Sequence, residues 1–272
     1  MNTNSNTQVF VDQLREQIKS APSGIDISAL ENALKDIEQP VQSGAKIWFL
    51  LDRSGSMGRL TNDVINGFNK FLSEQTEKND EALMSVILFD GHDPFEVIEA
   101  DTPIRDIEPL DQNRYFARGN TPLYDAIGTL IKQADRRIRR RKHENLPEED
   151  QLVIIFTDGL ENASRRYFRN EVFGMVNDRM EQDWTFVFMG ANQDSYAEGG
   201  SIGFKSGSIQ NYDPSPASIS EAFGSLSRAS GEFRGKGSQE RRSSKEDFFS
   251  GVKEAEMLAR RQKRENRDPS NG

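Results

Sequence analysis

The stretch Lys46-Ile-Trp-Phe-Leu-Leu-Asp52-Arg-Ser54-Gly-Ser56-Met-Gly58 joins an apolar run to an Asp-x-Ser-x-Ser loop. A short apolar run that ends in turn residues is typical of a strand buried on both faces of a sheet. The loop therefore displays one carboxylate and two hydroxyls at the carboxyl end of a strand. Such oxygen groups suit a hard divalent cation such as Mg²⁺, which prefers octahedral oxygen ligands. Taken alone, Asp, Ser and Gly after a strand are also ordinary turn residues.

Predicted strands and helices alternate outward from this stretch. Strands are predicted at 46–52, 83–89, 95–99, 152–157, 184–189 and 208–212, and helices at 60–76, 122–141, 168–181, 194–200 and after Pro216. Nearly continuous apolar strands that alternate with amphipathic helices predict an α/β domain with a mainly parallel sheet and helices on both faces. The short connection Asp90-Gly-His-Asp-Pro94 predicts a hairpin, and so one antiparallel edge strand.

Composition divides the chain into three parts. Residues 1–43 carry two short helical patterns, at 9–18 and 27–37, and predict an N-terminal helical arm that packs on the domain or on a partner. The α/β domain is expected at 44–230. Residues 231–272 are rich in Gly, Ser, Lys, Arg and Glu, which predicts a charged C-terminal tail that is partly disordered or helical.

The chain has 272 residues, no cysteine and a formal net charge of −9. The lack of cysteine excludes disulfides and thiolate metal sites, and it fits a reducing compartment. The start of the chain has neither the basic nor the apolar region of a secretory signal, and no segment approaches the roughly 20 apolar residues that cross a bilayer. We therefore expect a soluble, cytoplasmic protein without a membrane partner. The acidic charge argues against nucleic acid as a ligand, because phosphate binding usually needs a basic face.

Two further polar loops are expected to lie beside the Asp-x-Ser-x-Ser loop. Arg118-Gly-Asn-Thr121-Pro122 opens a predicted helix, and Thr157-Asp158-Gly159 follows the apolar strand at 152–157. Open parallel sheets bind ligands outside the carboxyl ends of their strands, so these loops are expected to meet. Taken alone, Thr121 is also a plain helix N-cap.

Together, these loops resemble a known metal site. The residues that match, in order, the metal ion-dependent adhesion site of von Willebrand factor A domains are Asp52, Ser54, Ser56, Thr121 and Asp158. The resemblance covers roughly residues 45–212. It implies a Rossmann-like sheet with Mg²⁺ or Mn²⁺ at its top. By the same resemblance, the serines and the threonine bind the ion directly or through water, and the aspartates hold it largely through bridging waters.

The resemblance also implies a function. It predicts a metal-dependent protein-binding module, not an enzyme, in which an Asp or Glu of a partner protein completes the coordination of the ion. The chain looks closer to intracellular bacterial members, including the tellurite-resistance type often encoded beside kinases, phosphatases or ATPases, than to secreted adhesion proteins. An adaptor role in such a system is therefore the expectation.

The main alternative is a Mg²⁺-dependent phosphoester hydrolase or phosphotransferase. Phosphotransferases of the haloacid dehalogenase type need a second acid two positions after the nucleophilic Asp, and Ser54 occupies that position here. A serine hydrolase elbow needs Gly-x-Ser-x-Gly, whereas the sequence has Ser54 in place of the first glycine, and no histidine is placed to act as its base. Nucleic-acid binding through the basic tail is a third option, which requires a salt-sensitive affinity.

Other polar residues leave two interpretations open. The basic run Arg136-Arg-Ile-Arg-Arg-Arg-Lys142 lies at a helix C-terminus, where the helix dipole favours positive charge, or it docks a partner. Glu161 and Asn162 follow Asp158 closely, so they either shape the rim of the site or only form a turn.

Overall fold

The computed structural model describes residues 13, 15–20, 27–28, 30, 44–78, 82–158, 160–191 and 195–250. The chain divides into two units, Met1–Ser43 and Gly44–Gly272, and the division falls at the predicted start of the α/β domain. In the first unit, residues 13, 15–19, 28 and 30 are helical, and all but residue 19 fall inside the two helical patterns expected for the arm.

The second unit is built around one sheet. Its strands are β1 (Gly44–Asp52), β2 (Leu83–Phe89), β3 (Glu96–Pro103), β4 (Glu149–Thr157), β5 (Thr185–Ala191) and β6 (Ile209–Tyr212). They lie in the order β3-β2-β1-β4-β5-β6, and every neighbouring pair is parallel except β2 and β3, which are antiparallel. The predicted mainly parallel sheet with one antiparallel edge strand is confirmed.

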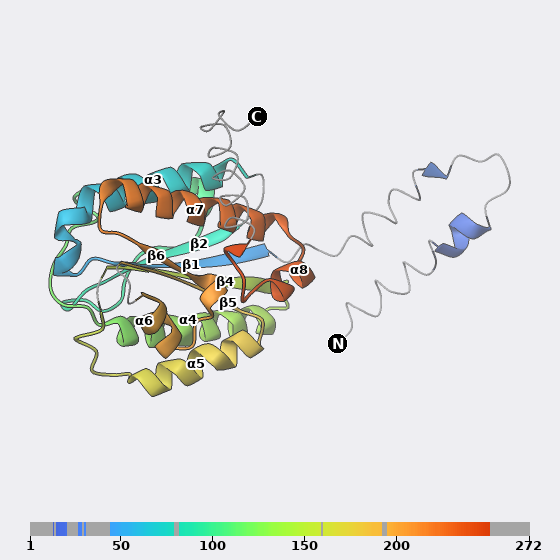
Figure 1. Ribbon diagram of the computed structural model, residues 1–272. Helices are drawn as coiled ribbons and strands as arrows, with labels where there is room; N and C mark the ends of the chain where they lie inside the picture. The colour runs from blue at the N-terminus through green and yellow to red at the C-terminus, as the bar shows by residue number, and fades with distance from the viewer. Residues whose placement is uncertain are drawn as a thin grey trace, which may run out of the picture. The chain divides into compact units, whose positions relative to one another are not determined.

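Helices cover both faces of this sheet. They are α3 (Thr61–Thr76), α4 (Leu123–His143), α5 (Arg169–Glu181), α6 (Ser195–Ser201), α7 (Pro216–Gly235) and α8 (Ser238–Ser243), with short 3-10 turns at η1 (Gly55–Leu60), η2 (Ile104–Asp106) and η3 (Ser206–Ser208). Figure 1 shows α3 and α7 on one face and α4, α5 and α6 on the other. Helices on both faces explain why the central strands are apolar on both sides.

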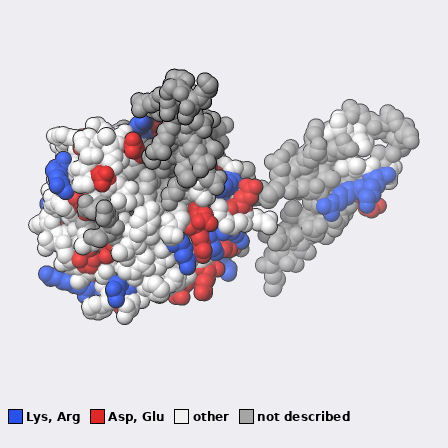
Figure 2. Space-filling model, in the orientation of Figure 1, with Lys and Arg blue, Asp and Glu red and all other residues white. Residues whose placement is uncertain are grey.

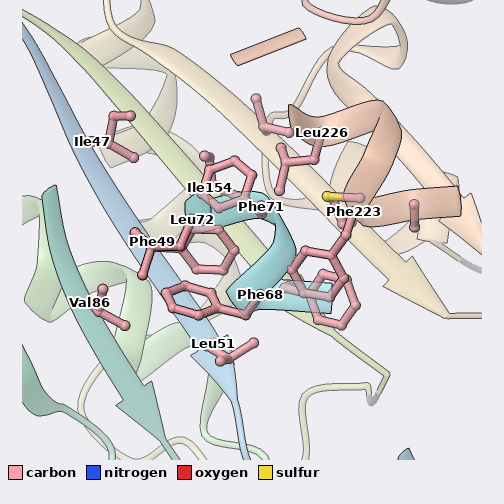
Figure 3. Packing of buried hydrophobic residues seen from close by; sticks show 14 of the residues in the cluster. Ile47, Phe49, Leu51, Phe68, Phe71, Leu72, Val86, Ile154, Phe223 and Leu226 are labelled. Carbon is pink, nitrogen blue, oxygen red and sulfur yellow. The ribbon is translucent and has the colours of Figure 1, made fainter. Parts of the chain in front are cut away.

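Strand β1 shows how the two hydrophobic layers arise. Side chains alternate along a strand, so Phe49 faces the layer under α3 and α7, while Trp48 and Leu50 face the layer under α4. Figure 3 shows Phe68 and Phe71 of α3 packed on Phe49. The rings of Phe49 and Phe68 meet edge to face with centroids 5.2 Å apart, a favoured aromatic geometry. The buried β1 is thereby fixed in place, and its last residue, Asp52, is fixed with it.

The segment after residue 230 differs from the predicted tail. Helix α7 continues to Gly235, α8 follows it, and Phe249 is fully buried in the layer under α3 and α7. The buried Arg241 binds the Asp150 carboxylate at 2.9 Å and donates to the carbonyl of Phe233. Figure 2 shows side chains of both charges next to one another around α8.

The composition of that segment is polar, but Arg241, Phe248 and Phe249 anchor it to the domain. The domain therefore extends at least to Ser250, and the predicted boundary at 230 is too early. Residues 251–272, which include the basic run 260–264, lie outside the described part of the chain. Within that part, no helix is long and apolar enough to span a membrane.

Candidate metal centre

Asp52 ends β1 and is fully buried. One of its oxygens accepts the backbone N–H of Ser54 at 2.6 Å, which turns the chain sharply into η1. The other oxygen accepts the hydroxyl of Thr157, the last residue of β4, also at 2.6 Å. The carboxylate therefore joins the carboxyl ends of two neighbouring parallel strands.

The two serines of the first loop lie together and reach the third loop. The Ser54 and Ser56 hydroxyl oxygens are 3.2 Å apart, and the Ser56 hydroxyl donates to Asp158 at 2.6 Å. Ser54 is buried and Ser56 is exposed, while Asp158 is partly buried. The oxygen cluster therefore has a buried floor and a solvent-facing rim.

Thr121 comes from the second loop, which is tied to both of the others. Its backbone N–H donates to the Asn162 side chain at 2.9 Å, and the Asn162 N–H donates to the Thr121 carbonyl at 3.1 Å. The N–H of Gly55 donates to the carbonyl of Gly119 at 2.9 Å. The residue that caps α4 is Pro122, and the Thr121 hydroxyl makes no hydrogen bond within the part of the chain that the structure describes. The plain N-cap interpretation of Thr121 is therefore wrong.

The structure thus brings all five predicted residues to three loops that are bonded pairwise to one another. Asp52 and Thr157 join the first loop to the third, Gly55 and Gly119 join the first to the second, and Thr121 and Asn162 join the second to the third. Their shared place at the carboxyl edge of the sheet is the usual ligand position in open α/β folds.

Two buried tyrosines support the site and escaped the sequence analysis. Tyr115 donates its hydroxyl to the carbonyl of Asp52 at 2.7 Å, and Tyr212 donates to the carbonyl of Thr157 at 2.9 Å. Both bonds fix the last peptide groups of the strands that carry the carboxylates. For Tyr115, the available signal was the aromatic pair Tyr115-Phe116 inside the mostly polar stretch Asp111–Arg118.

The electrostatics of the site suit a cation. Burial raises the pKa of Asp52 to about 7, although hydrogen bonds from Thr157 and Ser54 favour its charged form. Burial also raises the pKa of Asp158, against the opposing effects of the Ser56 hydrogen bond and the nearby Arg59. Taking two carboxylates out of water is costly without a positive partner, so a bound divalent cation would stabilise both in their charged forms.

The family model of the von Willebrand factor type A domain matches residues 46–221, which is more than half of the chain. The chain belongs to the von Willebrand factor type A family. The resemblance drawn from the three loop motifs is therefore confirmed at the level of the family.

Solved structures match this chain at low sequence identity. The pilus adhesin SpaC of Lactobacillus rhamnosus GG matches with a TM-score of 0.54 and 11% identity, over 72% of this chain and 31% of that chain. Proximal thread matrix protein 1 of the mussel byssus, solved with a zinc-occupied metal ion-dependent adhesion site, matches with a TM-score of 0.47 and 16% identity, over 67% and 47%.

The manganese-loaded TRAP protein of Plasmodium vivax matches with a TM-score of 0.44 and 16% identity, over 67% of this chain and 74% of that chain. This chain spans less than half the length of the thread matrix protein and less than a third of the adhesin. No curated protein is similar enough in sequence to count as a match.

The donor set of this von Willebrand factor A domain fits Mg²⁺ or Mn²⁺ better than a thiolate or imidazole metal. Two carboxylates and three hydroxyls supply only oxygen, the ligand that hard cations prefer. Among the described residues, no three His, Cys, Asp or Glu side chains converge to hold an ion. A site here therefore depends on the hydroxyls of Ser54, Ser56 and Thr121 as much as on the carboxylates.

Glu161 and Asn162 serve the loops around the centre. Glu161 accepts the N–H of Tyr124 in the first turn of α4 at 2.9 Å and the N–H of Ser164 at 2.7 Å. Asn162 fixes Thr121 as described above. Both residues therefore shape the second and third loops, and their side-chain oxygens are already engaged by the protein. Residues 192–194, which include the first residue of the predicted helix at 194–200, lie outside the described part of the chain.

A second layer of charge holds the first and second loops from behind. The buried Arg53 of the Asp-x-Ser-x-Ser loop binds Asp90, and Arg118 binds the same carboxylate at 2.9 Å. The pKa of Asp90 is lowered, because hydrogen bonds from Arg118, Arg53 and backbone N–H groups outweigh the effect of burial. This ion cluster gives Arg53, at the first variable position of the Asp-x-Ser-x-Ser motif, a role that the motif alone does not indicate.

Proposed function

We propose that the protein is a metal-dependent protein-binding module. One divalent cation, Mg²⁺ or Mn²⁺, is held by Asp52, Ser54, Ser56, Thr121 and Asp158. The observation that carries the proposal is the convergence of three cross-bonded loops on a cluster of oxygens with a buried floor and an exposed rim. A cation seated on that floor keeps one side open to solvent.

The proposed ligand of that open side is an Asp or Glu of a partner protein. Two carboxylates neutralise a divalent cation, while the three hydroxyls add no charge, so the ion retains enough affinity for one further carboxylate. Arg59 at the rim, close enough to Asp158 to affect its pKa, adds positive potential for an acidic partner. We infer that recognition needs both the ion and a partner carboxylate.

The cellular role is proposed by analogy. The resemblance to intracellular bacterial members supports a cytoplasmic adaptor for a kinase, phosphatase or ATPase system. Catalysis is not part of the proposal, because the nucleophile, acid and base positions of the hydrolases considered above are not filled by suitable residues. Mg²⁺-dependent turnover of p-nitrophenyl phosphate that is lost on Asp52→Asn would instead favour the phosphoester hydrolase.

The function can be tested by partner capture with a matched set of variants. Immobilised full-length chain is incubated with lysate of the source cell with Mg²⁺, with EDTA, and with EDTA followed by excess Mg²⁺, and bound proteins are identified by mass spectrometry. We expect specific partners to be lost in EDTA and recovered with Mg²⁺.

The variant Asp158→Asn keeps the shape of the side chain but removes its charge, and should lose the same partners. Ser73→Ala, an exposed serine on α3, serves as the control and should retain them. Capture that is unchanged by EDTA and by Asp158→Asn would rule out the proposed mode of binding.

A further inference from the structure

A second pocket lies away from the metal centre, between the sheet and the C-terminal half of α4. Its volume is about 370 Å³, within the range of about 300–1,000 Å³ common for small-molecule sites. Trp48 lines its floor and precedes Asp52 by four residues on β1, which is about 13 Å along a strand. The pocket is therefore separate from the three loops that form the metal centre.

An irregularity in the pairing of the edge strand β3 with β2 lies beside this pocket. The pairing of β2 with β3 shifts register between Met84 and Val86 and again between Val86 and Ile87. Asp101 of β3 has a φ of 52°, an uncommon conformation for a residue other than glycine, and its N–H donates to the Ser85 hydroxyl at 3.0 Å. Such bulges re-aim side chains and occur preferentially near functional sites.

The interior of the pocket wall is a network of ion pairs in which Lys46, Arg137 and Arg141 share the carboxylates of Asp101 and Glu149. The buried Lys46 ammonium lies 2.8 Å from Asp101 and 4.5 Å from the centre of the Trp48 ring. Arg137 binds Asp101 at 2.7 Å and also pairs with Glu149, which in turn contacts Arg141 at 3.1 Å. In the basic run of α4, Arg137 and Arg141 therefore have a structural role. These ion pairs leave no spare negative charge for the remaining arginines.

The mouth of the pocket carries the excess positive charge. Arg136 and Arg140 both line it and are exposed. Arg136 makes no ion pair with any residue that the structure describes, and Arg140 approaches only Asp101, at 3.8 Å. The two arginines are one helical turn apart, so their guanidinium groups can reach the same head group. Gln133 adds an amide one turn earlier on the same helix.

Apart from Ser85 and the ion-paired Asp101 and Arg137, the remaining lining is apolar. Ile87 and Trp48 form the buried floor, and Val97 and Ala100 form an exposed wall on β3. Val97 is 40% exposed and so remains accessible to a ligand. A ligand that fits this combination has an apolar body to cover the floor and wall, and an anionic head to meet the guanidinium groups.

We propose that this pocket binds an aryl phosphate, with the aromatic ring on Ile87 and Val97 and the phosphate between Arg136 and Arg140. A phosphate offers three oxygens to two planar guanidinium forks and carries close to two negative charges at neutral pH. An aromatic ring covers much apolar surface and also stacks on guanidinium groups. The ring is either a free small molecule or the phosphotyrosine side chain of a protein.

The binding test uses the full-length chain in EDTA, which removes any cation from the metal centre. Phenyl phosphate is titrated by calorimetry, and separately by fluorescence of the variant Trp184→Phe, in which Trp48 is the single remaining tryptophan. We expect saturable one-to-one binding, a change in Trp48 emission, and weaker binding of inorganic phosphate. The absence of saturable binding at millimolar phenyl phosphate, or equal affinity for inorganic phosphate, would overturn the proposal.

Charge variants test the role of the two arginines. Arg136→Glu combined with Arg140→Glu should weaken binding by at least about tenfold, because hydrogen bonds between charged groups are the strong class. Arg139→Glu changes charge on the same helix, is exposed, and lies outside the pocket lining, so it should have a much smaller effect. Equal losses in both would show a general charge effect and contradict the proposed site. Circular dichroism confirms folding.

A final comparison identifies the source of the ring. A phosphotyrosine peptide that binds at least as tightly as phenyl phosphate, and that is weakened by the same double variant, identifies a phosphorylated protein. A peptide that fails to bind while phenyl phosphate binds identifies a small molecule. Either result keeps the aryl phosphate site, and failure of both ligands removes it without affecting the proposed metal-dependent function.

Discussion

The hydrogen bond from Thr157 to Asp52 is the most direct link between two of the loops, and its removal has a calculable effect. The donor and acceptor are 2.6 Å apart and both residues are buried, so water cannot replace the lost bond without reorganisation. Hydrogen bonds to charged groups contribute about 1.5–3 kcal/mol. We expect Thr157→Val, which keeps the shape and removes the hydroxyl, to lower the free energy of unfolding by that amount.

The assay is urea unfolding followed by circular dichroism, in EDTA and in excess Mg²⁺. In a thermal scan, a loss of about 1.5–3 kcal/mol in the free energy of unfolding corresponds to a fall in the melting temperature of roughly 3–12 °C for a domain of this size. Thr157→Ser is the control, because it keeps the hydroxyl and loses one methyl group, which should cost about 0.8 kcal/mol. Mg²⁺ should also stabilise Thr157→Val less than Thr157→Ser, because Asp52 is no longer held in place. Equal stability and equal Mg²⁺ responses in the two variants would refute this account of the site.

Three further predictions concern the body of the domain, and each is measured by urea unfolding. Burial lowers the pKa of Lys46 from 10.5 to about 8, so between these pH values the unfolded chain binds more protons and stability should rise with pH. Lys46→Met should abolish that rise, and an unchanged pH profile would contradict it. Gly67→Ala places a methyl group 2.2 Å from the Phe223 ring and should destabilise by about 1–3 kcal/mol. Gly174→Ala in α5 meets nothing within 4 Å and should stabilise by about 0.5–1 kcal/mol; the same sign for both glycine variants would be inconsistent with the packing. Arg241→Met leaves the Asp150 carboxylate without its closest cation and should destabilise by about 3 kcal/mol, whereas a loss below 1 kcal/mol would show that the C-terminal segment is not anchored there.

The strands of the sheet could be predicted from the sequence because they are short apolar runs with a clear end. Asp52 and Thr157 close two such runs, so the position of the loops followed from the strand pattern alone. The antiparallel pairing of β2 with β3 followed from the short connection between them. Periodicity and turn residues are local properties, and a single chain displays them directly.

Contacts between distant residues were beyond the sequence. The sequence around Tyr115 and Tyr212 does not show which distant carbonyls, those at the ends of β1 and β4, their hydroxyls reach. The polar composition of residues 231–250 concealed the anchoring by Arg241, because a buried ion pair has the same composition as a solvated one. The pocket beside α4 depends on a register shift that is a property of two paired strands.

Anomalous diffraction from crystals grown with Mn²⁺ would locate a divalent cation held between the three loops. We expect one anomalous peak bounded by the hydroxyl oxygens of Ser54, Ser56 and Thr121, with the carboxylates of Asp52 and Asp158 behind bridging waters, and no peak there in crystals of Asp158→Asn. A manganese peak elsewhere in the domain, with none between these residues, would contradict this expectation.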